Sequence, residues 1–142
     1  MNKAKAFLSQ VEKLDTLIQN KEVEKRQWRD IALGITSRTD GERVKSSGSQ
    51  QKMANAVDKY IDLEKEIDRE IDRLVDTKRE ILAVIEQLKP LEYDFLHKVY
   101  IQRMSLQDVA SAYGMSYSWA TTTHGIALKN VNKMLEARER AS

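Results

Sequence analysis

The sequence predicts an all-α protein, and three observations lead to this prediction. The 142-residue chain has five glycines and one proline, and 32% of its residues are charged, a composition that suits long helices better than a sheet. Apolar residues recur at intervals of three and four, the spacing of one helix face. Turn-forming residues concentrate near residues 34–51 and at Pro90. We therefore expect a long helical hairpin over residues 1–89 and a small helical domain over residues 90–142.

The hairpin is expected to be antiparallel and to resemble a coiled coil. Its helices cover about residues 3–35 and 52–88, and each has an apolar seam interrupted by polar residues, which can fix the register of a helix pair. In the first helix the polar seam residues are Lys21 and Lys25, and in the second they are Glu64 and Lys78. An antiparallel pairing allows the two lysines to face Glu64.

A flexible loop is expected at about residues 36–51, because Gly, Ser, Thr and Asp dominate there. Its basic residues Arg38, Arg43 and Lys45 allow an anion contact, although a solvated linker is the simpler interpretation. The segment lacks the Gly-Lys-Ser/Thr ending of a phosphate-binding loop.

A two-helix hairpin buries one narrow seam, so apolar side chains outside that seam are candidates for self-association or partner contacts. The five candidates are Leu17, Trp28, Leu63, Val75 and Leu82. The carboxylates of the second helix are interpreted as a solvated face.

Residues 105–135 have the pattern of a helix-turn-helix. Leu106, Val109 and Tyr113 recur at helical spacing, and Gly114 follows where a helix commonly ends in a left-handed residue. Ser116 is a good N-cap for the next helix. A short helix over residues 91–103, opened by Pro90, is expected to pack beneath this pair. The arrangement is typical of units that place their second helix in the major groove of DNA.

The candidate DNA contacts lie in the first turns of the second helix and at three basic residues. They are Ser116, Tyr117, Ser118, Trp119, Thr121, Thr122, Lys129, Lys133 and Arg103. Three roles stay open for Trp119: it stacks on DNA, it anchors a protein partner, or it folds back on the short helix. His124 is interpreted as a packing or helix-surface residue rather than a metal ligand, and neither histidine is spaced for metal binding.

Composition excludes several functional classes. The chain has no cysteine, so it has neither a disulfide framework nor a thiolate metal site. No apolar run reaches membrane-spanning length, and the start of the chain lacks the pattern of a signal peptide. We found no catalytic or cofactor motif, so we expect a cytoplasmic protein that is not an enzyme. Residues 90–142 carry six basic and five acidic side chains, which is too little excess charge for binding DNA by bulk electrostatics.

From Pro90 onward, the chain resembles the fourth region of bacterial sigma-70-type factors. The matching residues are Pro90, Val99–Tyr100, Ser105–Leu106, Val109–Ala110, Gly114–Met115–Ser116, Ala127–Leu128 and Val131. The whole chain, with its Val44–Gly48 segment and its His124–Gly125 pair, is similar to small phage and prophage proteins of Gram-positive bacteria. Regulators of the ArpU and RinA type are related to these proteins.

This resemblance implies a transcription regulator that binds double-stranded DNA. The chain departs from the sigma pattern, because Tyr117, Thr121 and Thr122 stand where several arginines or lysines are usual. We therefore expect weak binding by a monomer and a contribution from a homodimer or from RNA polymerase. The alternative is a non-enzymatic interaction protein that binds a host protein through the hairpin or the helix-turn-helix.

Overall fold

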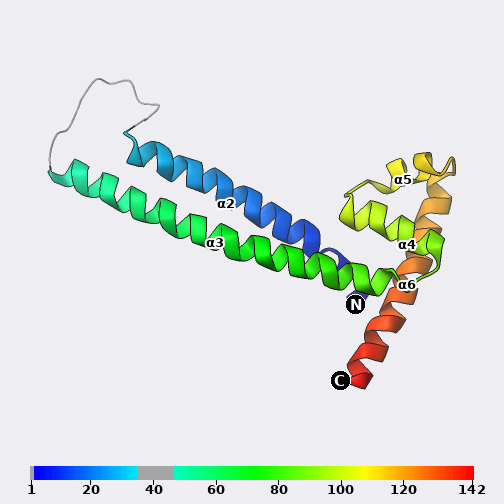
Figure 1. The fold of residues 1–142 in the computed structure, drawn as a ribbon. Coiled ribbons are helices and arrows are strands. Elements are labelled where there is room, and N and C mark those ends of the chain that lie inside the picture. Colours follow the sequence, from blue (N-terminus) through cyan, green and yellow to red (C-terminus); the bar gives the residue numbers. More distant parts are fainter. Residues whose placement is uncertain (1, 35–46) are drawn as a thin grey trace. The chain divides into compact units, whose positions relative to one another are not determined.

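The computed structural model describes residues 2–34 and 47–142, and every element in these residues is a helix (Figure 1), as the sequence predicts. In chain order the helices are α1 (Lys3–Leu8), α2 (Gln10–Ala32), α3 (Ser47–Ile85), α4 (Pro90–Leu96), the π-helix η1 (His97–Ile101), α5 (Leu106–Ala112) and α6 (Tyr117–Ala141). Packing separates two compact units. One is Asp15–Arg73, and the other combines the residues up to Leu14 with Leu74–Ser142.

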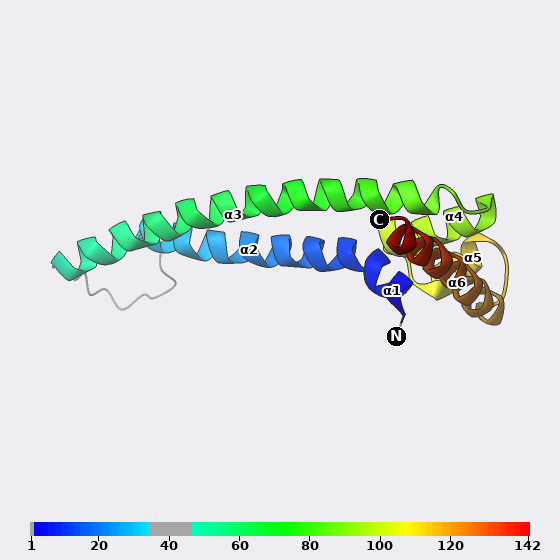
Figure 2. The same ribbon diagram turned by 90° about the horizontal axis from the view of Figure 1, so that it is seen from below.

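In the Asp15–Arg73 unit, α2 and α3 run side by side in opposite directions (Figures 1 and 2). The Lys21 Nζ atom lies 2.9 Å from Glu66 Oε1, and the Lys25 ammonium lies 5.2 Å from the centre of the Tyr60 ring. Lys21 therefore pairs with Glu66 instead of facing Glu64. The ion pair, acting mainly through its hydrogen bond, lowers the pKa of Glu66.

The seam that the sequence predicts for the second long helix is confirmed in part. It contains Val57, Tyr60, Ile67, Ile71, Leu74, Ile81, Ile85 and Leu88. Ile67, Ile81 and Ile85 are buried as expected, whereas Val57 and Ile71 are more than 40% exposed and Leu63, which was expected outside the seam, is buried. The apolar pattern of α3 is wide enough to contain two stripes at helical spacing, and packing against α2 covers the stripe that includes Leu63.

Helix α2 ends at Ala32, and the left-handed Gly34 follows it with φ of 72°. The Gly34 N–H donates to Ile31 O at 3.0 Å, which closes the end of the helix. Helix α3 begins at Ser47, earlier than residue 52, so the last part of the expected loop is helical. Arg38, Arg43 and Lys45 lie outside the described residues, as does most of the Val44–Gly48 segment.

The expected first helix is interrupted at Ser9, and the short α1 joins the core of the unit that contains α6. Ala4, Leu8 and Val11 are buried there with residues of α3 and α4. The Ala4 N–H donates to Asn132 Oδ1 at 2.7 Å. This compact unit therefore includes residues from both long helices, whereas the sequence suggested a boundary at residue 90.

The segment after Pro90 begins as an α-helix and widens into the π-helix η1. The Gln102 N–H donates to His97 O at 2.9 Å, a five-residue step, and the Met104 N–H donates to Lys98 O at 2.9 Å. Arg103 ends the segment with φ of 62°, a left-handed conformation that is uncommon for residues other than glycine. This geometry buries Tyr100 against α6.

Side-chain caps define the starts of both α5 and α6, and the sequence predicts the second of them, at Ser116. Ser105 Oγ accepts from the Asp108 N–H at 3.1 Å, and Ser116 Oγ accepts from the Trp119 N–H at 3.1 Å. Gly114 has φ of 65°, and the Met115 N–H donates to Ala110 O at 2.9 Å, which is the closure of a Schellman motif. The turn between the two helices is therefore specified locally.

Two glycine substitutions are expected to change stability in opposite directions. Gly114→Ala should lower the free energy of unfolding by about 1 kcal/mol, because alanine tolerates a positive φ poorly. Gly125→Ala should raise it by about 0.5–1 kcal/mol, because Gly125 lies inside α6. At both positions an added Cβ meets nothing within 4 Å, so backbone conformation alone separates the two results. Urea denaturation followed by circular dichroism measures both changes, and equal effects would contradict the left-handed turn.

Candidate nucleic-acid interface

Helix α6 has one buried side and one exposed side. It packs against α1, α4 and α5. The buried side chains are Ala120, Thr123, Ala127, Leu128 and Val131. The exposed side begins with Tyr117, Ser118, Thr121 and Thr122 and continues through Ile126 to Lys129 and Lys133. The first two turns therefore present mainly hydroxyl groups, and the charged groups follow further along the helix.

The expected DNA-contact residues differ in whether their polar groups already make hydrogen bonds within the protein. The Ser116 hydroxyl already accepts the capping hydrogen bond, and the Thr121 hydroxyl donates to Ser118 O at 2.9 Å. A hydroxyl that donates can still accept, so Thr121 keeps its lone pairs for a donor such as a base amine. Tyr117 is 53% exposed, and Thr122 is also exposed.

Trp119 folds back into the protein, which is the third of the roles considered for it. Its ring centre lies 5.4 Å from that of Tyr113 and 5.8 Å from that of Phe95, with the Phe95 contact edge to face. The side chain is half-buried. Trp119 therefore stabilises the junction of α4, α5 and α6, and little of its ring remains for another molecule.

A polar group of three residues ties α5 to α4. The Tyr113 hydroxyl donates to the Asp94 carboxylate, and Lys98 Nζ lies 3.0 Å from the same carboxylate. The Tyr113 hydrogen bond, followed by that of Lys98, lowers the pKa of Asp94. Burial, reinforced by Asp94, raises the pKa of Tyr113 to about 12. On the other side of α4, Asn130 Nδ2 donates to Glu92 Oε1 at 2.9 Å, so α6 is also fixed to α4.

The three basic residues proposed as DNA contacts belong to two different segments of the chain. Lys129 and Lys133 are exposed one turn apart on α6, beyond the hydroxyl-bearing turns. Arg103 belongs to the segment between η1 and α5, and it lines a cavity together with His124.

The five apolar residues proposed for self-association are exposed to different degrees. Leu17 and Val75 are 40% and 47% exposed. Trp28 and Leu82 are half-buried. Leu63 is only 8% exposed, because it lies on the inner face of α3. Leu63 therefore has little surface to offer a partner.

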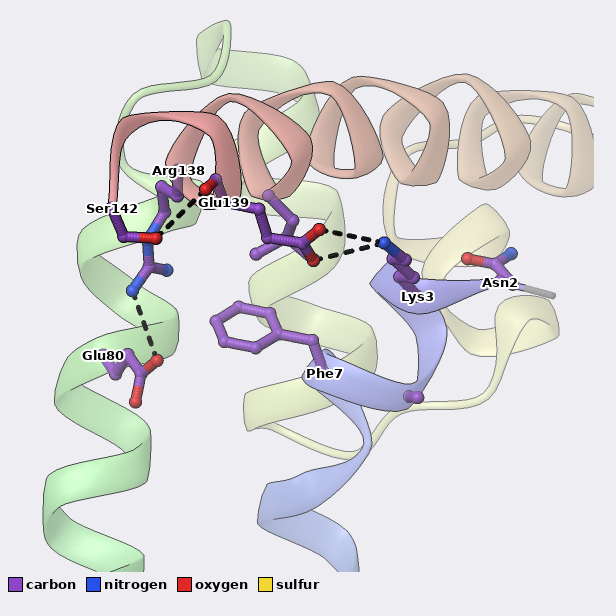
Figure 3. A pocket seen from close by; sticks show the side chains of 9 residues that line it. Asn2, Lys3, Phe7, Glu80, Arg138, Glu139 and Ser142 are labelled. Atoms are coloured by element: carbon purple, nitrogen blue, oxygen red, sulfur yellow. Dashed lines mark hydrogen bonds and ion pairs between the residues drawn. The ribbon is translucent and has the colours of Figure 1, made fainter.

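The open groove in Figure 3 lies at the C-terminal end of α6, where this helix meets α1 and α3. Lys3 Nζ lies 3.1 Å from Glu139 Oε2, and Arg138 Nη2 lies 3.4 Å from Glu80 Oε1. Phe7 lies between these two ion pairs. Each charged side chain that lines the groove has a partner of opposite charge, so the groove attracts no particular ligand charge.

Sequence reasoning missed a cavity of about 450 Å³ that is bordered by η1, α5 and α6. Tyr100 Oη lies 2.7 Å from His124 Nε2, and their rings stack with centres 5.7 Å apart. Burial raises the pKa of Tyr100 to about 12. Burial, followed by the positive charge of Lys5, lowers the pKa of His124. The η1 geometry that brings Tyr100 and His124 together has no recognisable sequence signal.

The lowered pKa of His124 predicts that the protein loses stability in mild acid. The unfolded chain takes up a proton near the ordinary pKa of 6.5, whereas folded His124 takes one up only at lower pH. The free energy of unfolding should therefore fall as the pH decreases from about 7 until the folded pKa is reached. Urea titrations at several pH values measure this slope. The slope should disappear in His124→Gln and persist in His97→Gln, and its persistence in His124→Gln would contradict the prediction.

No helix in residues 2–34 and 47–142 is long and apolar enough to cross a membrane. Within the same residues, no group of three or more histidine or acidic side chains is close enough to hold a metal ion.

Comparison with known proteins assigns the chain to a family. No curated protein and no solved structure matches the sequence significantly. One family model, described as "Protein of unknown function (DUF1492)", matches residues 35–135, which is more than half of the chain. The match includes all of α3, α4, η1 and α5 and most of α6. The chain therefore belongs to the DUF1492 family.

Proposed function

We propose that the chain is a phage-type DNA-binding transcription regulator in which α5, the Gly114 turn and α6 act as a helix-turn-helix. The observation that carries this proposal is the two-sided character of α6. Its apolar side packs on α1, α4 and α5, whereas the side with Thr121 and Thr122 is exposed immediately after the cap at Ser116. In helix-turn-helix proteins, the N-terminal residues of the second helix contact base edges.

The chemistry of this surface favours a particular kind of DNA contact. Threonine hydroxyls can donate to or accept from base edges, and threonine methyl groups can contact the methyl group of thymine. Lys129 and Lys133 would neutralise phosphates. With so few cations, binding should have a shallow salt dependence for each chain, and a homodimer would double the contacts. The antiparallel α2–α3 hairpin, through exposed side chains such as Leu17, would supply self-association or contact RNA polymerase.

Selection of bound fragments from sheared genomic DNA, at two salt concentrations, tests the proposal and identifies the site. The double variant Thr121→Ala/Thr122→Ala should then lose about 0.5–1.5 kcal/mol of binding free energy for each hydrogen bond to a base edge that is removed. Thr16→Ala is the matched control, because Thr16 is an exposed threonine in the other unit. If the double variant and the parent bind every DNA probe with the same affinity, α6 is not the helix that contacts the bases.

A second candidate function is protein binding without DNA. The exposed apolar side chains of Met115, Tyr117 and Ile126 on the turn and on α6 favour it, as does the nearly balanced charge of residues 90–142. It predicts that a complex with a purified partner such as RNA polymerase survives nuclease treatment and weakens in Ile126→Ser. Trp119→Ala is unsuitable for this test, because Trp119 packs on Phe95 and Tyr113. A complex that nuclease removes would instead support DNA binding.

A further inference from the structure

Helix α3 has a second apolar stripe, which α2 leaves exposed. Val57 and Ile61 lie one turn apart on this stripe, and Met53 and Ile71 extend it toward the two ends of α3. The side chains of these four residues are 38–43% exposed, although each is apolar. All four belong to the Asp15–Arg73 unit, so the stripe is a surface of the α2–α3 hairpin alone.

The stripe lies on the side of the hairpin that faces away from Trp28. Trp28 lines a cavity together with Lys21 of α2 and Glu66 of α3, so these residues define one side of the helix pair. With 3.6 residues per turn, Val57 is rotated by about 180° around α3 from Glu66, and Ile61 by about 140°. Both stripe residues therefore lie on the opposite side.

Helix α2 contributes two charged residues to the same side as the stripe. The inner face of α2 includes Lys25, whose ammonium lies over the Tyr60 ring. Glu22 and Arg26 are rotated by about 60° and 100° from Lys25, in the opposite sense to Lys21. Arg26 is exposed and Glu22 is half-buried. These two residues therefore border the stripe along α2.

The stripe also contains two exposed acidic side chains, which favour one direction of pairing. Glu64 and Asp68 continue the alternating spacing of four and three residues from Val57 and Ile61 to Ile71. If the stripes of two copies packed in parallel, each residue would face its own counterpart, so Glu64 would meet Glu64 and Asp68 would meet Asp68. Like charges in such contact strongly disfavour association. An antiparallel pairing avoids both contacts.

An antiparallel pairing also brings opposite charges together on both borders of the stripe. On the border away from α2, the exposed Asp58 would face Lys65 of the second copy, and on α2, Arg26 would face Glu22 of the second copy. The midpoints of these two pairs are near residue 61 of α3 and at residue 24 of α2. The ion pair and the cation–π contact between α2 and α3 place these midpoints at the same level of the hairpin. One two-fold axis therefore satisfies both borders.

We propose that a second copy of the chain covers this stripe, so that two α2–α3 hairpins form an antiparallel four-helix bundle around Val57 and Ile61. A single hairpin buries one seam, and the bundle gives each α3 helix a second apolar contact. The proposal rests on the homodimer of the proposed regulator. It places that dimer on the Val57 side of the hairpin instead of the side of Leu17, which lies three turns from Trp28 on the same face of α2.

Sedimentation equilibrium of the full-length chain, without DNA, tests whether this surface forms the dimer. The parent should dimerise, and Ile61→Glu should raise the dimer Kd by about tenfold or more, because it adds a negative charge beside the axis, next to Glu64 of the second copy. Leu17→Glu is the matched control in the same compact unit and should dimerise as the parent does. Circular dichroism should show unchanged helix content in both variants. A monomeric parent, or equal dimer Kd values for the two variants, would overturn the proposal.

Cross-linking tests the antiparallel direction, and the absence of cysteine from the chain makes single-cysteine variants specific. A short bismaleimide reagent should join two copies of Ile61→Cys, because residue 61 lies beside the axis. It should not join two copies of Ile71→Cys, because the two residues would lie about 28 Å apart along the bundle. Efficient cross-linking of both variants would mean a parallel pair and would contradict the proposed bundle. Neither test involves DNA, so their failure would reject this dimer and not the proposed DNA binding.

Discussion

Phe95→Ala is expected to lower the free energy of unfolding by about 3–5 kcal/mol, because it removes a large side chain from the centre of the core. Phe95 has no exposed surface, and its ring contacts Trp119 edge to face and lies 6.2 Å from the His124 ring. The loss includes the transfer of the ring from water and the cavity left among its neighbours. Phe95 therefore joins α4 to the side of α6 that faces away from the candidate DNA surface.

Tryptophan fluorescence can follow the unfolding of the compact unit that contains Phe95, and so measure the loss of stability in Phe95→Ala. Trp28 and Trp119 belong to different compact units, so a Trp28→Phe background leaves Trp119 as the reporter for the unit that contains Phe95. Leu91→Ala is the matched control on the same helix, because Leu91 is 45% exposed. It should change the midpoint of urea unfolding little. Similar midpoints for Phe95→Ala and Leu91→Ala would contradict the position of Phe95 in the core.

Leu8→Ala is expected to lower the free energy of unfolding by about 2–5 kcal/mol. Leu8 belongs to α1, and its side chain is fully buried in the core that α3, α4 and α6 share. The prediction therefore tests whether the first residues of the chain complete the unit that contains α6. In the Trp28→Phe background, the unfolding of Trp119 should shift to lower urea concentration.

Leu17→Ala is the control for Leu8, because Leu17 lies nine residues further along the chain and is 40% exposed. It should leave the Trp119 transition nearly unchanged. Equal shifts in the two variants would mean that α1 contributes no more to this core than an exposed turn of α2.

Local signals predicted α5, the turn and α6 well. Each signal acts through a few neighbouring residues: Gly114 supplies the left-handed residue that ends α5, and Ser116 caps α6. Ala127, Leu128 and Val131, which the resemblance to sigma-type factors includes, lie at helical spacing and are buried in α6. Local hydrogen bonding and periodicity are sufficient for such features, because they require no knowledge of distant partners.

Features that depend on distant partners were not predictable from the pattern alone. The break at Ser9 follows no proline or glycine, and it lets α1 pack with residues more than one hundred positions away, including Asn132. Val57 was wrongly placed on the inner face of α3 and Leu63 was wrongly left off it, because stripes through these two residues have similar spacing. The fold-back of Trp119 requires Phe95 and Tyr113 to be in place. In each case the local sequence is compatible with more than one arrangement, and packing against residues distant in the sequence determines which one forms.

The hydrogen bond between Ala4 and Asn132 also means that α1 cannot complete its packing until α6 has been synthesised. The two residues are 128 positions apart, so at ordinary rates of translation the ribosome needs about 10 seconds to make the intervening chain. Throughout that time α1 has none of its α6 contacts, and the apolar side chains of Ala4 and Leu8 lack their final partners. A transcript truncated before α6 would yield a product with this apolar segment uncovered, a form that chaperones and proteases recognise. Because α1 and α6 share one core, this unit can be completed only after α6 has been synthesised.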